Sequence, residues 1–427
     1  MKFYYKDTSL LSNEEITNTI QSLSSYIEYL NTVATQNNYE ADEASLNLPF
    51  DIELIKKVRE LAQKKKTSQL KYLIIIGIGG SNLGTKAFYD GLYGYYDVLQ
   101  PNRFPKIIFL DTQDEEVLAK ATELIDKLHS KDEIIINAIS KSGGTTETAA
   151  NLEVVYKALH NKFGDINDRI VITTDDGSYM QQVAEEKGID FITMPKKVGG
   201  RFSVFSAVGM FPFALLEFDI NKIVQSTQEM RDLCIKNELH NPALISAAIL
   251  YLHYKNGKNI NDNFIFLPQL ESLGKWYRQL MGESIGKDGE GITPTVSIGS
   301  TDLHSVGQLY LGGRKDKVTT FIYGQNTKFN TTVPSETSFN LVSVIKSRQI
   351  HEIMNAIVSG TKVAYQKQQL PFMEIVLDTV TEGEIASFMQ FKMMEMMYLG
   401  KLIDVNTFDQ PHVELYKTET KKILSQL

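Results

Sequence analysis

The sequence contains one cysteine, Cys234, among 427 residues. A single thiol excludes an internal disulfide and disfavours a cysteine-based metal cluster, so we expect a packed side chain rather than a nucleophile. The chain also lacks an excess of positive charge. Its net charge of −8 argues against a nucleic-acid partner or an anionic membrane surface. An anionic ligand would therefore have to be held by local cations and helix ends.

Long hydrophobic runs are absent as well. The longest apolar stretch, residues 204–216, is too short to span a bilayer and contains Ser206 and Pro212. The first seven residues, MKFYYKD, lack the apolar core of a secretory signal. Together with the single cysteine, these features predict a cytoplasmic protein without a membrane partner.

The sequence does contain an alternation of strand-like and helical segments. A chain of this length exceeds the size of one hydrophobic core, so we expect two domains. Helical patterns follow the first four of five strand-like runs, at residues 72–77, 106–110, 133–139, 169–173 and 190–194. This alternation predicts a doubly wound parallel α/β sheet that binds ligands at the carboxyl ends of its strands. The first domain would span residues 48–195.

The remaining segments predict a second α/β domain at residues 196–385. A helix-rich stretch at 202–255 precedes strand-like runs at 263–267, 293–298, 318–323 and 373–377, which alternate with helical patterns at 270–281, 338–368 and 382–402. We expect an N-terminal helical segment over residues 1–47, with one helix at 13–35. A C-terminal helical arm over residues 386–427 would end in a helix with Pro411 at its first position.

A turn rich in hydroxyl groups and glycines follows the third predicted strand. It reads SKSGGTTET over residues 140–148, and helical spacing of apolar residues begins after it. Glycines bare the backbone N–H groups, and a helix N-terminus adds about half a positive charge. A helix cap needs only one hydroxyl group, whereas this turn has Ser140, Ser142 and Thr145. We therefore predict an anion site, for a phosphate group.

The first predicted strand ends in a glycine-rich turn, GIGGSN over residues 77–82. A dinucleotide fingerprint would need a glycine where Asn82 stands, and Asp111 lies beyond the usual spacing for a ribose-binding acid. A P-loop is also unsupported, because neither glycine–lysine pair has the upstream glycine. We expect this turn to bring Ser81 close to a sugar phosphate, without a nucleotide cofactor.

Further polar residues are candidates for catalysis, although each alone has an ordinary structural interpretation. Arg201 follows two glycines, and its planar fork of donors suits an enediolate or a carboxylate. Glu283 lies just past a predicted helix end, where the helix dipole makes a carboxylate a better base. Gln410 and Lys417 are two helical turns apart, so they share a face. His304 has no second histidine at ligand spacing, which leaves a metal site unsupported.

The order of these motifs resembles the glucose-6-phosphate isomerase family over residues 48–427. The matching segments are GIGGS at 77–81, SKSGGT at 140–145, GGRFS at 199–203, GES at 282–284, TDLH at 301–304 and FDQ at 408–410 with Lys417. The segments around Arg201 and Gln410 are family signatures. The resemblance implies two sugar isomerase domains that interconvert glucose 6-phosphate and fructose 6-phosphate without a metal or a nucleotide.

The resemblance also implies a role for each candidate. Glu283 would move a proton between C2 and C1 through a cis-enediol, Arg201 would stabilise the developing charge, and His304 and Lys417 would assist ring opening. The substrate-binding residues would be Ser81, Ser140, Lys141, Ser142, Thr145, Gly200 and Gln410. Family members commonly form homodimers in which the histidine reaches the neighbouring subunit's site, so His304 would act in trans.

One position departs from the family pattern: His412 stands where glycine is usual, at the start of the last helix. Two other functions stay open. A non-catalytic sensor of sugar phosphates would need the hydroxyl-rich turn but not Glu283, Arg201, His304 and Lys417 together. A broader isomerase would also accept mannose 6-phosphate, which depends on the shape of the pocket at C2.

Overall fold

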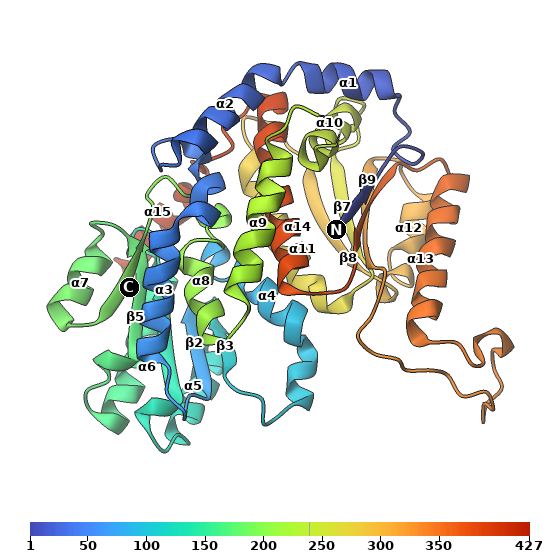
Figure 1. The fold of residues 1–427 in the computed structure, drawn as a ribbon. Coiled ribbons are helices and arrows are strands. Elements are labelled where there is room, and N and C mark those ends of the chain that lie inside the picture. Colours follow the sequence, from blue (N-terminus) through green and yellow to red (C-terminus); the bar gives the residue numbers. More distant parts are fainter. Residues whose placement is uncertain (239) are drawn as a thin grey trace.

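The computed structural model describes residues 1–238 and 240–427, and two sheets form its frame (Figure 1). The first sheet has the order β3-β2-β4-β5-β6 and is parallel throughout. Its strands are β2 (Tyr72–Ile76), β3 (Lys106–Leu110), β4 (Ile134–Ile139), β5 (Ile170–Asp175) and β6 (Asp190–Met194). Every residue of β4 is buried, as expected for a strand covered on both faces. The predicted α/β class is confirmed.

The second sheet has the order β1-β10-β9-β7-β8. Its strands are β1 (Lys2–Tyr4), β7 (Ile260–Ile265), β8 (Thr293–Ile298), β9 (Lys317–Gly324) and β10 (Phe372–Leu377). The four parallel strands repeat the winding of the first sheet, since β8-β7-β9-β10 corresponds to β3-β2-β4-β5. β1 pairs antiparallel with β10. The N-terminal segment was predicted to be helical, but it also contains this strand.

Three helix predictions differ from the structure. The helix predicted at 13–35 is two helices that break at Ser22, and the helix predicted from residue 338 begins only at Ile350. Pro411 lies two residues before the last helix rather than at its first position. The helices are α1 (Asn13–Gln21), α2 (Ser24–Gln36), α3 (Ile52–Lys65), α4 (Leu83–Tyr93), α5 (Glu115–Asp126), α6 (Thr146–Phe163), α7 (Tyr179–Lys187), α8 (Ala207–Leu215), α9 (Ile220–Cys234), α10 (Pro242–Lys255), α11 (Glu271–Ile285), α12 (Gly307–Gly312), α13 (Ile350–Lys367), α14 (Glu382–Ile403) and α15 (Val413–Leu424).

Helix α11 connects the two halves of the molecule. It packs against α4, which follows the glycine-rich turn of the first sheet, and against the buried helix α14. Lys392 and Glu395 of α14 form a fully buried ion pair with an N–O distance of 2.6 Å, and Tyr277 of α11 donates to the other Glu395 oxygen at 2.8 Å. These contacts fix the position of α11, which carries Glu283.

The structure also bears on the single cysteine and on the lack of long hydrophobic runs in the sequence. Cys234 is buried at the end of α9, where burial raises the pKa of its thiol, in agreement with a packed side chain. Within residues 1–238 and 240–427, no helix has both the length and the apolar character needed to cross a membrane.

Candidate active site

The hydroxyl-rich turn lies between β4 and the N-terminus of α6, as predicted. Ser140 Oγ lies 3.1 Å from Thr145 Oγ1 and accepts a hydrogen bond from Gly143 N–H at 3.1 Å. Ser142 Oγ accepts from Gly144 N–H at 3.3 Å. Gly143 has a φ of +73°, a conformation that favours glycine. The structure thus brings the three predicted hydroxyl groups into one turn, at a helix end suited to an anion.

Strand β5 supports this turn from behind. Thr174 Oγ1 donates to the carbonyl of Ser140 at 2.7 Å, and Asp175 N–H donates to the carbonyl of Lys141 at 3.1 Å. Burial raises the pKa of Asp175 to about 6, against the opposing effect of Lys141 and Lys196. The carboxyl group behind the turn therefore loses its negative charge in weakly acidic solution.

The glycine-rich turn after β2 joins the hydroxyl-rich turn to the segment around Arg201. A Cβ on Gly77 would lie 3.0 Å from the carbonyl oxygen of Ile139 and 2.8 Å from Cβ of Ser81. A Cβ on Gly80 would lie 2.1 Å from the carbonyl of Gly200, so only glycine fits there. Ser81 and Gly200 thus lie near the carboxyl ends of the neighbouring strands β2 and β4. The winding of the first sheet reverses there, and ligands bind at this place in such sheets.

Arg201 contacts both Glu283 and Gln410. Its side chain is buried, with the residue 2% exposed. Nη1 donates to Gln410 Oε1 at 2.9 Å and lies 3.4 Å from Glu283 Oε2. Burial lowers the pKa of Arg201 while Glu283 opposes the shift, and a guanidinium remains charged at neutral pH. Three residues predicted from separate segments therefore meet at one point.

The other guanidinium donors bind residues that the sequence did not single out. Nε donates to Ser284 Oγ at 2.9 Å, and Nη2 donates to the carbonyl oxygens of Thr407 and Asp409 at 2.6 and 3.0 Å. The side chain of Lys287 forms an ion pair with Asp409 at 2.8 Å. Arg201 is thus held on several sides, which fixes the direction of Nη1.

The sequence predicted that Glu283 lies just past a helix end. In the structure it lies in the last turn of α11. Its Oε1 accepts a hydrogen bond from Gln279 Nε2 at 3.0 Å. Gln279 precedes Glu283 by four residues and therefore lies one turn away on the same helix face. This spacing could have identified Gln279 from the sequence. The carboxylate is held by a different donor on each oxygen.

Within the described part of the chain, neither His304 nor Lys417 has a hydrogen bond or an ion pair with Arg201 or Glu283. His304 is exposed at the end of a short turn that follows the edge strand β8. Lys417 on α15 forms an ion pair with Glu414 at 2.7 Å. Their assignment to the site therefore remains a prediction.

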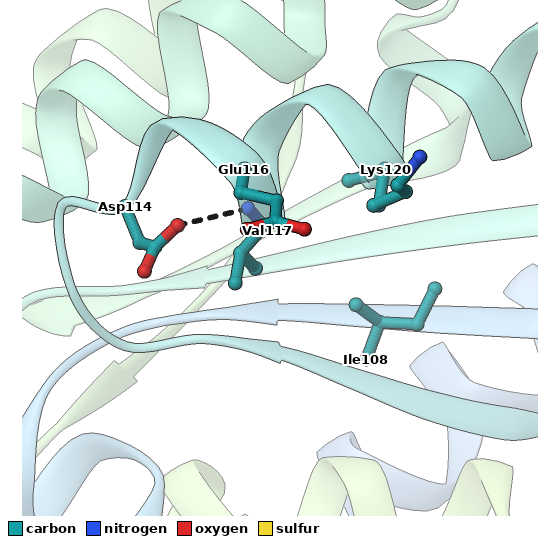
Figure 2. A pocket seen from close by; sticks show the side chains of 6 residues that line it. Ile108, Asp114, Glu116, Val117 and Lys120 are labelled. Atoms are coloured by element: carbon teal, nitrogen blue, oxygen red, sulfur yellow. Dashed lines mark hydrogen bonds between the residues drawn. The ribbon is translucent and has the colours of Figure 1, made fainter.

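A hollow beside α5 and the edge strand β3 contains none of the predicted site residues (Figure 2). Asp114 caps α5 there, because its Oδ1 accepts a hydrogen bond from Val117 N–H at 3.0 Å. The remaining lining residues are Ile108, Glu116, Lys120 and Ala121. Its acidic groups belong to the start of a helix, and we do not assign it to the site.

Two α/β sheets with the same winding, a hydroxyl-rich turn after the third strand of the first sheet and an arginine–carboxylate pair beside it are features of the sugar isomerase class of fold. The crystal structure of a glucose-6-phosphate isomerase from Chlamydia trachomatis has this fold. It superposes with a TM-score of 0.81 at 19% identity, covering 99% of this chain and 88% of that chain.

Sequence comparison gives the particular family. The family model for phosphoglucose isomerase matches residues 51–309. A glucose-6-phosphate isomerase from Methanocaldococcus jannaschii is 34% identical over 369 residues, 86% of each chain. One from Fusobacterium nucleatum is 30% identical over 429 residues, covering 99% of this chain and 95% of the relative. The chain belongs to the phosphoglucose isomerase family, which confirms the resemblance seen in the motifs.

Proposed function

We propose that this chain interconverts D-glucose 6-phosphate and D-fructose 6-phosphate through a cis-enediol, a reaction of glycolysis and gluconeogenesis. The proposal rests on the membership of the chain in this family and on the contact between Arg201 and Glu283, whose nitrogen and oxygen are 3.4 Å apart. Moving a proton next to a carbonyl group requires a positioned base and a cation where the oxyanion forms. Glu283 transfers the proton between C2 and C1, and Arg201 stabilises the negative charge on the enediol oxygens.

The substrate lies between the two turns of the first domain and the Arg201 segment. Ser140, Ser142 and Thr145 bind the phosphate group together with the backbone N–H of Lys141, and Ser81 lines the same pocket. Gly200 and Gln410 hold the open-chain sugar. The reaction moves a proton and an electron pair within one molecule, so the mechanism needs no electron carrier. We assign the two domains to residues 48–195 and 196–385 and place the protein in the cytoplasm.

The active protein is a homodimer in this proposal. Large apolar side chains are exposed on the segment between β9 and α13, which projects from the second domain (Figure 1). Phe339 and Leu341 are 85% and 87% exposed there, and Phe329 and Val344 are exposed as well. Apolar side chains gathered in this way are typical of a subunit interface. The interface would bring His304 into the neighbouring subunit's site, where it assists ring opening with Lys417.

A complementation experiment tests the trans role of His304. Glu283→Gln and His304→Ala subunits are each expected to be nearly inactive alone. When the two are co-expressed in equal amounts, half of the dimers are mixed, and each mixed dimer has one intact site if the histidine acts in trans. Activity should then recover to about a quarter of the wild-type value. No recovery in isolated mixed dimers would place His304 in the site of its own subunit.

The reaction itself is tested by a coupled assay that converts fructose 6-phosphate to glucose 6-phosphate. EDTA is present, and no nucleotide is added for the isomerisation step. We expect turnover by the wild-type chain. Binding of fructose 6-phosphate without turnover would support a sugar-phosphate sensor instead. The same assay with mannose 6-phosphate determines whether the pocket distinguishes the two configurations at C2.

A further inference from the structure

Helix α15 places a lysine beside the hydroxyl-rich turn of the first domain. A methyl group on Gly144 would lie 4.0 Å from Nζ of Lys421. Lys421 belongs to the C-terminal helix α15 (Figure 1) and lies more than 200 positions along the chain from that turn. The ammonium group of Lys421 therefore lies close to the backbone that we assign to phosphate binding.

The other charged groups of α15 distinguish Lys421 from its neighbours. Lys417 pairs with Glu414 at 2.7 Å, and Lys422 pairs with Glu419 at 3.7 Å. Both acids of the helix are thus occupied, and Lys421 has no side-chain hydrogen bond or ion pair with any residue that the structure describes. A cation with no partner among the described residues, next to hydroxyl groups and a helix N-terminus, adds a second positive charge to that of Lys141 within the turn.

We propose that Lys421 binds the phosphate group of the substrate together with the serine and threonine hydroxyls of the turn. This inference rests on the proposed function, which supplies a phosphate ester that carries nearly two negative charges at neutral pH. α15 buries none of its residues, so few contacts within the chain hold it. Binding through Lys421 would hold α15 in place, and with it Lys417, one helical turn away. Through Lys421, the phosphate group would thus contribute to the affinity for the substrate and would also fix the position of Lys417.

The test compares Lys421→Ala with Lys422→Ala, which removes an equal charge from the same helical turn. Initial rates with fructose 6-phosphate give KM and kcat, and competition by inorganic phosphate gives its inhibition constant. For Lys421→Ala, both KM and the inhibition constant for phosphate should rise about tenfold, the scale of one lost charge-assisted hydrogen bond. Lys422→Ala should stay within about twofold of wild type. Lys421→Arg should recover most of the phosphate affinity.

Equal effects of the two alanine variants would overturn the proposal, because they would reflect the general charge of the helix. An unchanged inhibition constant for phosphate in Lys421→Ala would overturn it as well. The fold of the variants is not at risk, since Lys421 lies on an exposed helix. If the wild-type chain shows no turnover, calorimetry with inorganic phosphate still measures the effect of Lys421, so the two proposals fail separately.

Discussion

Glu283→Gln is expected to lower kcat on the order of 10³-fold while leaving KM within about threefold, because an amide cannot accept the proton from C2. The substitution preserves size and the contacts around it. The amide oxygen can still face Arg201 Nη1. Once the Gln279 side-chain amide turns over, the new amide group can donate to Gln279 Oε1, which is buried and has no hydrogen-bond partner among the described residues. The loss therefore measures the base rather than the packing of the site.

Proton exchange provides the direct measurement. In deuterated buffer, nuclear magnetic resonance follows the loss of the C2 proton of glucose 6-phosphate, and the coupled assay follows net isomerisation. Both rates should fall together. Glu271→Gln is the matched control, since Glu271 lies at the start of the same helix and pairs with Lys275 at the surface. Near-normal exchange in Glu283→Gln would assign the base to another group.

Most strands were predictable from the sequence, but buried polar residues concealed the start of one of them. β3 and β8 have the predicted bounds, whereas β7 begins three residues earlier than the run that marked it. Its first four residues include Asn261, Asp262 and Asn263, all fully buried. Asp262 accepts hydrogen bonds from Thr295 and Ser297, and such distant partners have no signal in the local sequence. β1 was missed for a similar reason, because three residues form a strand only by pairing with β10.

The opposite error occurred after β9. Apolar residues at helical spacing predicted a helix from residue 338, but many of these side chains face solvent, as Leu341 does. Asn340 and Ser347 have φ angles of 49° and 59°, which an α-helix does not accommodate. Periodicity assumes that an apolar face is buried against the same chain. This segment exposes its apolar residues instead, as an interface between subunits would require.

The candidate site was predicted as separate residues but not as an arrangement. The hydroxyl-rich turn is local, so sequence alone placed it between a strand and a helix. Arg201 and Glu283 are 82 positions apart, and Gln410 follows Arg201 by 209. Their contact depends on how the two domains pack through α4 and α11. Only the order of the motifs, through the family resemblance, indicated that these residues belong together.

Arg201→Lys is the second substitution with a large expected effect, and it tests geometry because the charge is retained. The guanidinium contacts five acceptors through three nitrogens, among them Glu283, Gln410 and the carbonyl of Thr407. A lysine has one nitrogen with three donors, so at least two acceptors lose their partner. We expect kcat to fall by about 10²-fold, the scale of one lost oxyanion donor.

The division of the effect between kcat and KM identifies the role of Arg201. A fall in kcat with little change in KM means that the guanidinium acts on the charge that develops in the enediol; a rise in KM alone would make it a ground-state binder. Arg231→Lys is the matched control, since Arg231 is also largely buried but stacks on Phe50 and pairs with Asp232. It should affect thermal stability more than kcat. A similar loss of kcat in both variants would show that the Arg201 effect comes from general destabilisation rather than from the oxyanion.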